Sequence, residues 1–227
     1  MQFERFKLIV GEENFNKIQN TRVLLVGVGG VGSFVFEGLV RSGVLNIDIV
    51  DFDKVDITNL NRQLMTNLDN IGKDKVDVIE DRGLSINKNL KVGKYKCFLD
   101  KDNIDNIDFN YDYVIDCCDC LNTKKEIISK CLLKKVKFIT CMGTGNKLDP
   151  SKLEIIDIRK TSYDPLARRL RKWVNDNRIK GKILCCASLE KPIKNNTTII
   201  GSCSFVPSSA GLLIVSYIIR DIIKRLN

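Results

Sequence analysis

The chain has 227 residues, 44% of them hydrophobic, which is enough for one α/β domain with a sizeable core, and its formal net charge is +9. It contains no histidine, which excludes proton relays through imidazole and leaves general base chemistry to a carboxylate, to a lysine or cysteine of shifted pKa, or to the substrate. Acidic residues interrupt the N-terminal stretch where a leader would lie, and the longest apolar run, residues 205–219, is shorter than a membrane span, so we expect a cytoplasmic protein with no transmembrane segment.

The N-terminal twenty residues offer one short helix. Residues 1–10 are mixed in character, whereas residues 11–20 place Phe15 and Ile18 on one face of a predicted helix. Arg5 lies in the mixed part, where the simplest interpretation is a solvated terminal arginine.

Residues 23–50 have the pattern of a nucleotide-binding βαβ unit. An apolar run predicts a buried parallel strand, and glycines follow it in the spacing G-x-G-x-x-G just before a helical pattern. Such glycines leave room for a phosphate at the N-terminus of the helix. The next strand ends in Asp51, whose carboxylate can accept hydrogen bonds from ribose hydroxyls. The glycines of the turn are Gly27, Gly29, Gly30 and Gly32.

The residues that follow indicate a triphosphate. A nicotinamide-dependent oxidoreductase would be the default for the βαβ unit alone, but such an enzyme has no use for the polar loop that runs from Asp51 to Gln63. An asparagine, an arginine and a lysine near one nucleotide are suited to neutralise the triphosphate of ATP and the charge that develops at its α-phosphorus. The family resemblance given below implies this role for Asn59, Arg62 and Lys75, with Asp53 beside them.

Alternating helical and strand patterns occupy the rest of the chain. They predict strands around residues 92–99, 113–116, 137–142, 147–158 and 181–189, and helices over residues 74–87, 121–133, 165–176 and 205–219, with a turn of helix in the polar piece 100–110. This order predicts an α/β, Rossmann-like three-layer fold with a mostly parallel central sheet and a C-terminal extension of strands and helices.

A dense positive charge marks the second half of the chain. Residues 159–182 contain nine basic and two acidic residues, which accounts for most of the net charge. On the predicted helix over 165–176, basic residues share one face next to Trp173. Such a stripe favours nucleic-acid binding, although a merely solvated helix face is the alternative. The residues concerned are Arg168, Arg169, Arg171 and Lys172.

The nine cysteines are expected to be free thiols, because the cytoplasm is reducing. The spacing of a metal site occurs once, in Cys117-Cys118-Asp119-Cys120, and the adjacent Cys185 and Cys186 do not supply the second pair of a four-thiolate zinc site. Zinc is therefore disfavoured.

Several of these motifs together resemble a known superfamily. The loop 51–63, with Thr58-Asn59-Leu60-Asn61-Arg62-Gln63, and the lysine of Gly72-x-x-Lys75 resemble the ubiquitin-activating and sulfur-carrier-activating enzymes. The stretch 148–172, which contains Thr161-x-x-Asp164-Pro165-Leu166-Ala167, together with Glu190-Lys191-Pro192 and the segment 201–208, resembles the bacterial tRNA threonylcarbamoyladenosine dehydratases. The resemblance covers essentially the whole chain.

The resemblance implies an activity and a set of roles. The activity is ATP-dependent cyclisation of threonylcarbamoyladenosine in tRNA, with ATP and Mg²⁺ as cofactors. Asp119, the second carboxylate of Asp116-x-x-Asp119, would approach the magnesium ion, whereas its structural alternative is an N-cap for the following helix. Arg5 would reach the ATP of the neighbouring subunit, which implies a homodimer. A monovalent cation and a sulfur-transfer protein partner remain open.

One domain, residues 1–227, is expected, in which residues 1–145 bind the nucleotide and residues 146–227 bind the substrate and form the dimer. The alternative activity is adenylylation of the C-terminus of a ubiquitin-like sulfur-carrier protein, which would use the same nucleotide residues. The missing second C-x-x-C pair argues against that branch. Ubiquitin-activating relatives also form a thioester; Cys185, Cys186 and Cys203 are the candidates here, and small core residues are the alternative.

Overall fold

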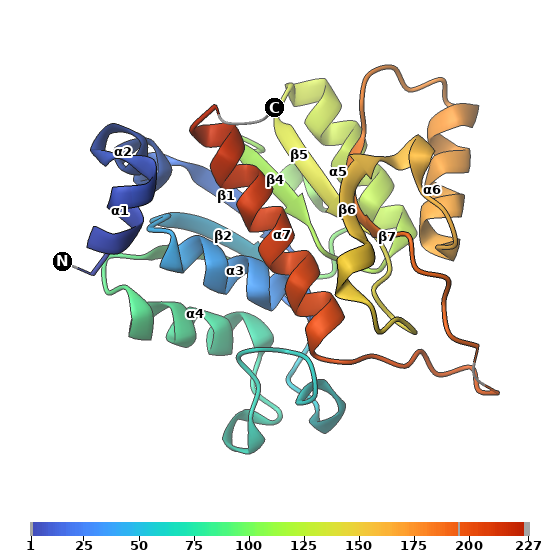
Figure 1. Cartoon of the computed structure of the whole chain (residues 1–227), viewed down its shortest axis with the longest axis horizontal. Coiled ribbons are helices and arrows are strands. Elements are labelled where there is room, and N and C mark those ends of the chain that lie inside the picture. The colour runs from blue at the N-terminus through green and yellow to red at the C-terminus, as the bar shows by residue number, and fades with distance from the viewer. Residues whose placement is uncertain (1, 195, 225–227) are drawn as a thin grey trace.

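The computed structural model describes residues 2–194 and 196–224. One seven-stranded sheet, in the order β3-β2-β1-β4-β5-β7-β6, runs through the molecule (Figure 1). All neighbouring strands pair in parallel except β6, which is antiparallel to β7. The predicted Rossmann-like α/β fold is confirmed. The strands are β1 Arg22–Val26, β2 Asn46–Val50, β3 Lys91–Tyr95, β4 Tyr113–Asp116, β5 Lys137–Cys141, β6 Leu153–Asp157 and β7 Leu184–Ser188.

Helices cover both faces of this sheet and make the three layers. Alternate residues of β1 enter different cores: Val23 and Leu25 pack with the helices in front of the sheet in Figure 1, and Leu24 and Val26 pack with α5 behind it. A strand that is apolar on both faces is what a covered parallel sheet requires. The helices are α1 Glu4–Val10, α2 Glu12–Asn20, α3 Gly32–Arg41, α4 Lys75–Ile86, α5 Leu121–Lys134, α6 Pro165–Asp176 and α7 Phe205–Ile222.

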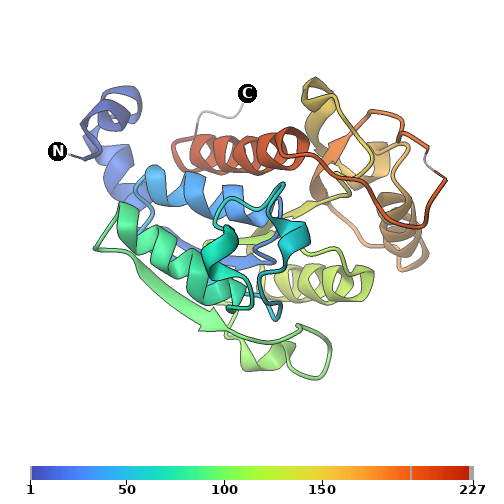
Figure 2. The ribbon, with the colours of Figure 1, turned by 90° about the horizontal axis from the view of Figure 1, so that it is seen from below.

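The last helix, α7, lies across α3 on the front face, as Figures 1 and 2 show. The two helices approach closely because glycines face the contact: a Cβ on Gly211 would lie 2.6 Å from the Val31 carbonyl oxygen, and one on Gly38 would lie 3.0 Å from Val215. With 18 residues, α7 is long and apolar enough to cross a membrane by length and composition alone, but 44% of it is buried inside the fold. Its apolar face is accounted for by packing on α3.

Some predicted boundaries are wrong. Residues 4–10 form the helix α1 instead of a mixed segment, and the strand expected over 92–99 ends at Tyr95 because the chain then turns to the carboxyl edge of the sheet. The strand expected from residue 147 begins at Leu153, since Pro150 starts a turn of 3₁₀ helix, Pro150–Lys152, before it.

The strand order reverses direction beside β1. The chain passes from β1 to β2 on one side and later returns to β4 on the other side. In open parallel sheets, the crevice at the carboxyl ends of such strands is where ligands bind.

Candidate active site

The carboxyl ends of the strands surround a cavity of about 420 Å³ at this reversal point. Its wall contains Gly29 and Gly30 after β1, Asp51 after β2, Asp119 after β4 and Gly143 after β5. The cavity therefore gathers residues that are more than a hundred positions apart in sequence, and it includes most of those expected to hold the nucleotide.

The glycine turn is shaped by close backbone contacts. Gly27 has φ +85°, and a Cβ at Gly32 would lie 1.8 Å from the Gly27 carbonyl oxygen, so no other residue fits at Gly32 without opening the turn. Gly29 and Gly30 meet no such obstacle, and both face the cavity. The first pair thus closes the turn, and the second pair leaves backbone open to a ligand at the N-terminus of α3.

Asp51 anchors the turn to the end of β2. Its carboxylate accepts hydrogen bonds from the Val28 N–H at 2.8 Å and from the Asp53 N–H at 2.9 Å. Burial raises the pKa of Asp51, although these two hydrogen bonds act in the opposite direction. The carboxylate therefore has a structural task in addition to the expected contact with ribose.

The Lys75 ammonium is held in place by Asp53. Lys75 is 5% exposed, and its Nζ lies 2.6 Å from Asp53 Oδ2 on the cavity wall. The Lys75 N–H also donates to the Asp53 carbonyl at 3.0 Å. Because both ends of the lysine are fixed, its charge is positioned before any ligand arrives.

Asn59 and Arg62 come from the loop between β2 and α4. Asn59 accepts a hydrogen bond from the Asp56 N–H at 3.1 Å and closes a capping box around the short 3₁₀ helix Ile57–Asn59. The Arg62 guanidinium donates to the Thr58 carbonyl at 2.7 Å and to Asn61 Oδ1 at 2.9 Å, and Arg62 lines the cavity. Both residues lie where the sequence places them.

Gln63 belongs to the same loop and was given no role from the sequence. Its side chain lines the cavity, and its Oε1 atom is buried without a hydrogen-bond partner among the residues that the structure describes. A buried acceptor without a partner costs free energy, so Gln63 is a candidate for a ligand contact. The sequence includes Gln63 in the loop motif without a role, and the burial of its Oε1 atom, which is a tertiary property, points to a ligand contact.

Asp119 is exposed on the cavity wall. Within residues 2–194 and 196–224 its carboxylate makes no hydrogen bond or ion pair. The alternative role as an N-cap is wrong, because the N-cap of α5 is Cys120 and not Asp119. Asp119 is therefore free to meet a ligand.

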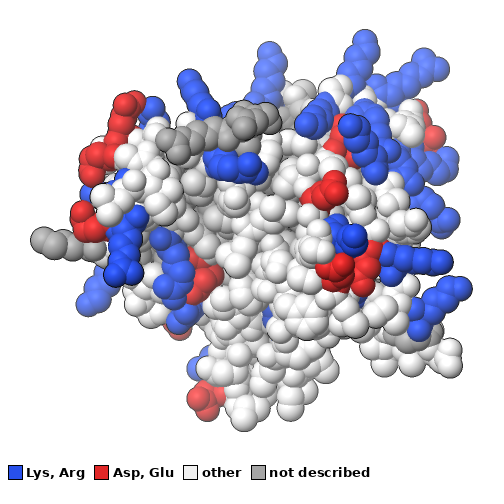
Figure 3. Space-filling model, in the orientation of Figure 1, with Lys and Arg blue, Asp and Glu red and all other residues white. Residues whose placement is uncertain are grey.

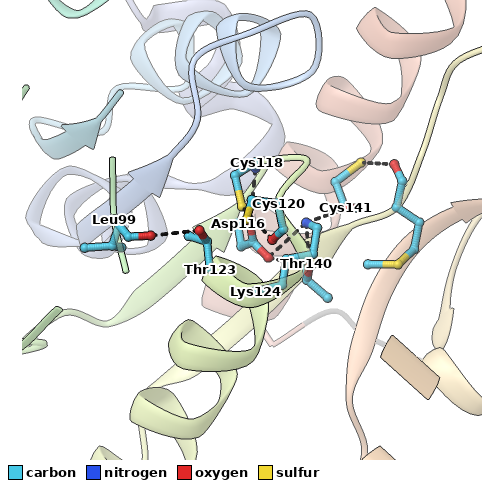
Figure 4. Close-up of polar contacts among 9 residues, drawn as sticks. Leu99, Asp116, Cys118, Cys120, Thr123, Lys124, Thr140 and Cys141 are labelled. Carbon is cyan, nitrogen blue, oxygen red and sulfur yellow. Dashed lines mark hydrogen bonds and ion pairs between the residues drawn. The ribbon is translucent and has the colours of Figure 1, made fainter. Parts of the chain in front are cut away.

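A buried ion pair supports the loop that carries Asp119 (Figure 4). Lys124 is fully buried, and its Nζ lies 3.0 Å from Asp116 Oδ2 and 2.8 Å from the Cys141 carbonyl oxygen. Burial is the largest single effect and would lower the pKa of Lys124, but the Asp116 carboxylate together with Cys118 and Cys141 raises the pKa, so the lysine stays charged. Asp116 in turn accepts from the Thr140 hydroxyl at 2.6 Å and the Cys118 N–H at 3.1 Å. This network joins the two loops that follow β4 and β5.

Within the described part of the chain, no group of three histidine, cysteine or carboxylate side chains is placed to hold a metal ion. A single carboxylate at Asp119 still suits Mg²⁺, which commonly binds through one or two carboxylates and the phosphates of its substrate. The site thus fits an ion that arrives with a nucleotide.

Comparison with known proteins agrees with this geometry. The family model described as the ThiF family matches residues 2–223. The chain belongs to the ThiF family. It is 37% identical to the tRNA threonylcarbamoyladenosine dehydratase of Bacillus subtilis over 244 aligned positions, which cover 100% of this chain and 96% of that protein.

Solved structures of a ThiF-family relative match closely. The crystal structure of the Escherichia coli tRNA N6-threonylcarbamoyladenosine dehydratase in complex with AMP has a TM-score of 0.93 and 30% identity, and covers 99% of this chain and 94% of that one. The structure of the same enzyme in complex with ATP has a TM-score of 0.92 at 30% identity, with the same coverage.

Part of the cavity wall in this ThiF-family chain comes from the second half of the sequence. It is formed by Gly143, Thr144 and Gly145 after β5, by Leu166 at the start of α6, and by Ile200. A Cβ on Gly145 would lie 2.3 Å from Ile200 Cγ2, so the segment before α7 packs on this loop. The second half of the chain therefore contributes walls to the same cavity.

The thioester candidates are poorly placed. Cys185 and Cys186 are buried in β7; burial raises the pKa of the Cys185 thiol to about 12, and a hydrogen bond with Cys141 together with burial raises that of Cys186. Cys203 is half-buried, with its thiol 3.5 Å from the Lys147 carbonyl oxygen.

Cys120, which was not a candidate, lines the cavity at the start of α5. Burial opposes ionisation of its thiol, but hydrogen bonds from Thr123 and from the first amides of the helix lower its pKa. A thiolate at a helix N-terminus is the usual setting of a reactive cysteine.

The remaining predicted residues lie outside the cavity. Arg5 is exposed on α1, at the opposite end of the molecule from α6 in Figure 1. Lys and Arg side chains gather along the upper and right edges of the molecule in Figure 3, over α6. Arg168 and Arg169 are exposed there, and Lys172 pairs with Asp176 at 2.8 Å.

Arg171 departs from the expected stripe. Its guanidinium donates to the Thr161 carbonyl at 2.6 Å and to the Thr161 hydroxyl at 2.7 Å. These bonds hold the loop before α6 against the helix, so Arg171 has a structural task that the other basic residues of α6 lack.

Proposed function

We propose that the chain catalyses the ATP-dependent cyclisation of threonylcarbamoyladenosine in tRNA through an acyl-adenylate of the threonyl carboxylate. The observation that carries the proposal is the cavity, in which Asn59, Arg62, Lys75 and Asp119 meet the open backbone of the glycine turn. It is supported by the end-to-end match to the Bacillus subtilis dehydratase and by the ATP and AMP complexes of the Escherichia coli relative.

A free carboxylate is a poor acylating agent because oxide or hydroxide is a poor leaving group. The carboxylate must therefore be activated before a nucleophile can attack it. An oxygen of the threonyl carboxylate attacks the α-phosphorus of ATP, the bond to the bridging oxygen breaks, and pyrophosphate leaves. An atom of the same ureido-threonine arm then attacks the activated carbonyl, and AMP leaves as the ring closes. Because this second step is intramolecular, proximity supplies much of the rate, and no enzyme nucleophile is needed.

Each cavity residue has a proposed role in binding ATP. Gly29 and Gly30 offer backbone amides to phosphate, and Gly27 and Gly32 shape that turn. Asp51 contacts the ribose. Arg62 and Lys75 neutralise the phosphates, with Asp53 orienting the lysine, and the Asn59 amide donates a hydrogen bond to a phosphate oxygen.

The metal proposal rests on Asp119. Its carboxylate is unpaired and exposed on the cavity wall, so it would hold Mg²⁺ against the phosphates of ATP. When bound, the ion would offset negative charge on the leaving pyrophosphate. A monovalent cation is a further expectation from the resemblance alone.

The proposed assembly is a homodimer in which Arg5 completes the neighbour's site. The face over α7 is largely uncharged in Figure 3, and Leu212 of that helix is 50% exposed, as a self-association surface would be. The helix α1, which carries Arg5, lies at one border of this face in Figure 1.

In this proposal residues 1–145 bind ATP, and residues 146–227 bind tRNA and the second subunit. We propose that the protein acts in the cytoplasm. A sulfur-transfer protein partner is proposed on the family resemblance alone.

The test is to compare acceptors. The chain is incubated with ATP, Mg²⁺ and either tRNA that carries threonylcarbamoyladenosine or a small carrier protein ending in Gly-Gly. We expect AMP and pyrophosphate only with the tRNA, together with loss of one water from the modified nucleoside, detected by mass spectrometry. AMP formation with the carrier protein alone would favour the sulfur-carrier adenylyltransferase instead.

A further inference from the structure

The loop before α6 contains an unusual backbone turn centred on Tyr163. The Asp164 N–H donates to the Ser162 carbonyl at 2.8 Å, which closes a three-residue turn, and Tyr163 has φ +60°. The γ-turn with positive φ is the rarer and more strained of the two forms. A bulky aromatic residue is among the least suited to it, because its Cβ crowds the backbone in the left-handed region.

The other left-handed residues have ordinary explanations. Among the non-glycine residues that the structure describes, Lys135, Arg178 and Lys224 follow the ends of α5, α6 and α7, where left-handed residues commonly terminate helices. Asn146 is of the residue type that tolerates this region best. Tyr163 precedes a helix, and glycine or asparagine would make the same turn with less strain. The fold therefore accounts for a tight turn at position 163, but it does not account for a tyrosine at that position.

Tyr163 is largely exposed. The residue is 60% exposed, and among the described residues its ring makes no aromatic or cation–π contact. Its neighbour Asp164, by contrast, is 6% exposed and caps α6 by accepting the Ala167 N–H at 2.7 Å. Strain kept at one exposed residue on an otherwise well-anchored loop is a reason to look for function.

The position of the turn suggests which function. Leu166, three residues further on, lines the cavity, so the backbone of Tyr163 lies within about 10 Å of a lining residue by chain length. Arg168 and Arg169, on the next turn of the same segment, are exposed cations. An exposed aromatic ring beside unpaired cations is the combination that binds single-stranded RNA, because bases stack on the ring and phosphates contact the cations.

We propose that Tyr163 is a base-stacking residue for the RNA substrate, and that it holds a nucleobase next to the modified adenosine at the cavity mouth. This inference rests on the proposed function for the identity of the RNA. The strained turn keeps the ring at the surface, between the cavity and the basic face of α6, at no cost to the core.

Three variants test the proposal. Tyr163→Asn keeps a residue that accepts positive φ and removes the ring, Tyr163→Phe keeps the ring and removes the hydroxyl, and Arg169→Gln removes a nearby cation. We measure the affinity for tRNA by fluorescence anisotropy at several salt concentrations, the apparent Michaelis constant for tRNA, the affinity for ATP, and the melting temperature.

We expect Tyr163→Asn to weaken tRNA binding about tenfold, the size of one lost base stack, with ATP affinity unchanged and a melting temperature equal to or above that of the parent. Tyr163→Phe should bind tRNA as the parent does. The salt dependence should keep its slope in Tyr163→Asn and become shallower in Arg169→Gln, because stacking releases no counterions.

Equal tRNA affinity in Tyr163→Asn and the parent would overturn the stacking role while leaving the proposed function intact, provided that the parent converts the modified tRNA. Loss of binding in Tyr163→Phe as well would assign the effect to the hydroxyl and also overturn stacking. A parent that neither binds nor converts the tRNA would instead overturn the proposed function and this inference together.

Discussion

Arg62 and Lys75 are the two cations that the cavity presents to a nucleotide. We predict that Arg62→Met and Lys75→Met each slow AMP formation by about a hundredfold or more with the fold intact, since each removes charge aimed at the transition state. The measurement is AMP release at saturating ATP and modified tRNA. Lys54→Met is the matched control, because Lys54 lies on the same loop with its side chain 68% exposed and should keep the parental rate. Near-parental turnover in either cavity variant would contradict the assignment.

Cys120 should be the cavity cysteine that reacts first with iodoacetamide. Its lowered pKa gives a larger thiolate fraction near neutral pH, whereas burial raises the pKa of Cys117 and Cys118 in the same loop. The rate of alkylation at Cys120, followed by peptide mass spectrometry, should therefore rise at lower pH than for an unperturbed thiol, and bound ATP should protect the thiol.

The variant Cys120→Ser should nevertheless cyclise the modified tRNA at a rate within about tenfold of the parent, because the ring closes without an enzyme nucleophile. Accumulation of adenylate in that variant would reveal covalent catalysis.

At the scale of elements, the contact between α7 and α3 couples packing to the site. The Cβ of Gly211→Ala would lie 2.6 Å from the carbonyl oxygen of Val31, the residue just before α3, and 2.9 Å from Phe34 Cβ. We predict a loss of about 1 to 3 kcal/mol in the free energy of unfolding, and weaker ATP binding because the glycine turn moves with Val31. Thermal unfolding and ATP titration provide the measurement. Ser216→Ala, on the exposed side of the same helix, should leave both essentially unchanged. Alanine is the better helix former at both positions, so a similar loss in Ser216→Ala would show that the close contact of Gly211 with α3 is not the cause.

At the scale of the whole molecule, the uneven charge in Figure 3 should govern tRNA affinity. Each phosphate contact that is lost lowers the slope of log affinity against log salt by roughly 0.7 to 0.9. Arg168→Glu with Arg169→Glu should therefore weaken tRNA binding and flatten its salt dependence, with ATP affinity unchanged. Arg171 is left in place because it holds Thr161. Lys88→Glu with Lys101→Glu changes the net charge equally at exposed sites elsewhere and should bind tRNA nearly as the parent does. Equal loss of tRNA affinity in both double variants would show that net charge alone governs binding, and that the positions of Arg168 and Arg169 do not matter.

The sequence by itself determined the glycine turn, Asp51 and the order of strands and helices, because each depends on spacing within a few residues. Gly32 had to be glycine for a local reason, because its Cβ would meet the Gly27 carbonyl oxygen, whereas a Cβ on Gly27 would also meet the backbone of Cys117 and Cys118 after β4. Arg62 and Lys75 were singled out by two short motifs, Thr58–Gln63 and Gly72-x-x-Lys75, each of which is contiguous in the chain.

Only the tertiary structure decided which of several similar side chains matter. Lys124 is buried against Asp116 while the adjacent Lys125 is half-buried, and no local pattern separates the two. Arg171 bonds to Thr161 while Arg168 stays exposed, and Leu166 reaches a cavity whose glycine turn lies more than a hundred residues earlier. Burial and partnership depend on which elements the folded sheet brings together, and that information is absent from spacing along the chain.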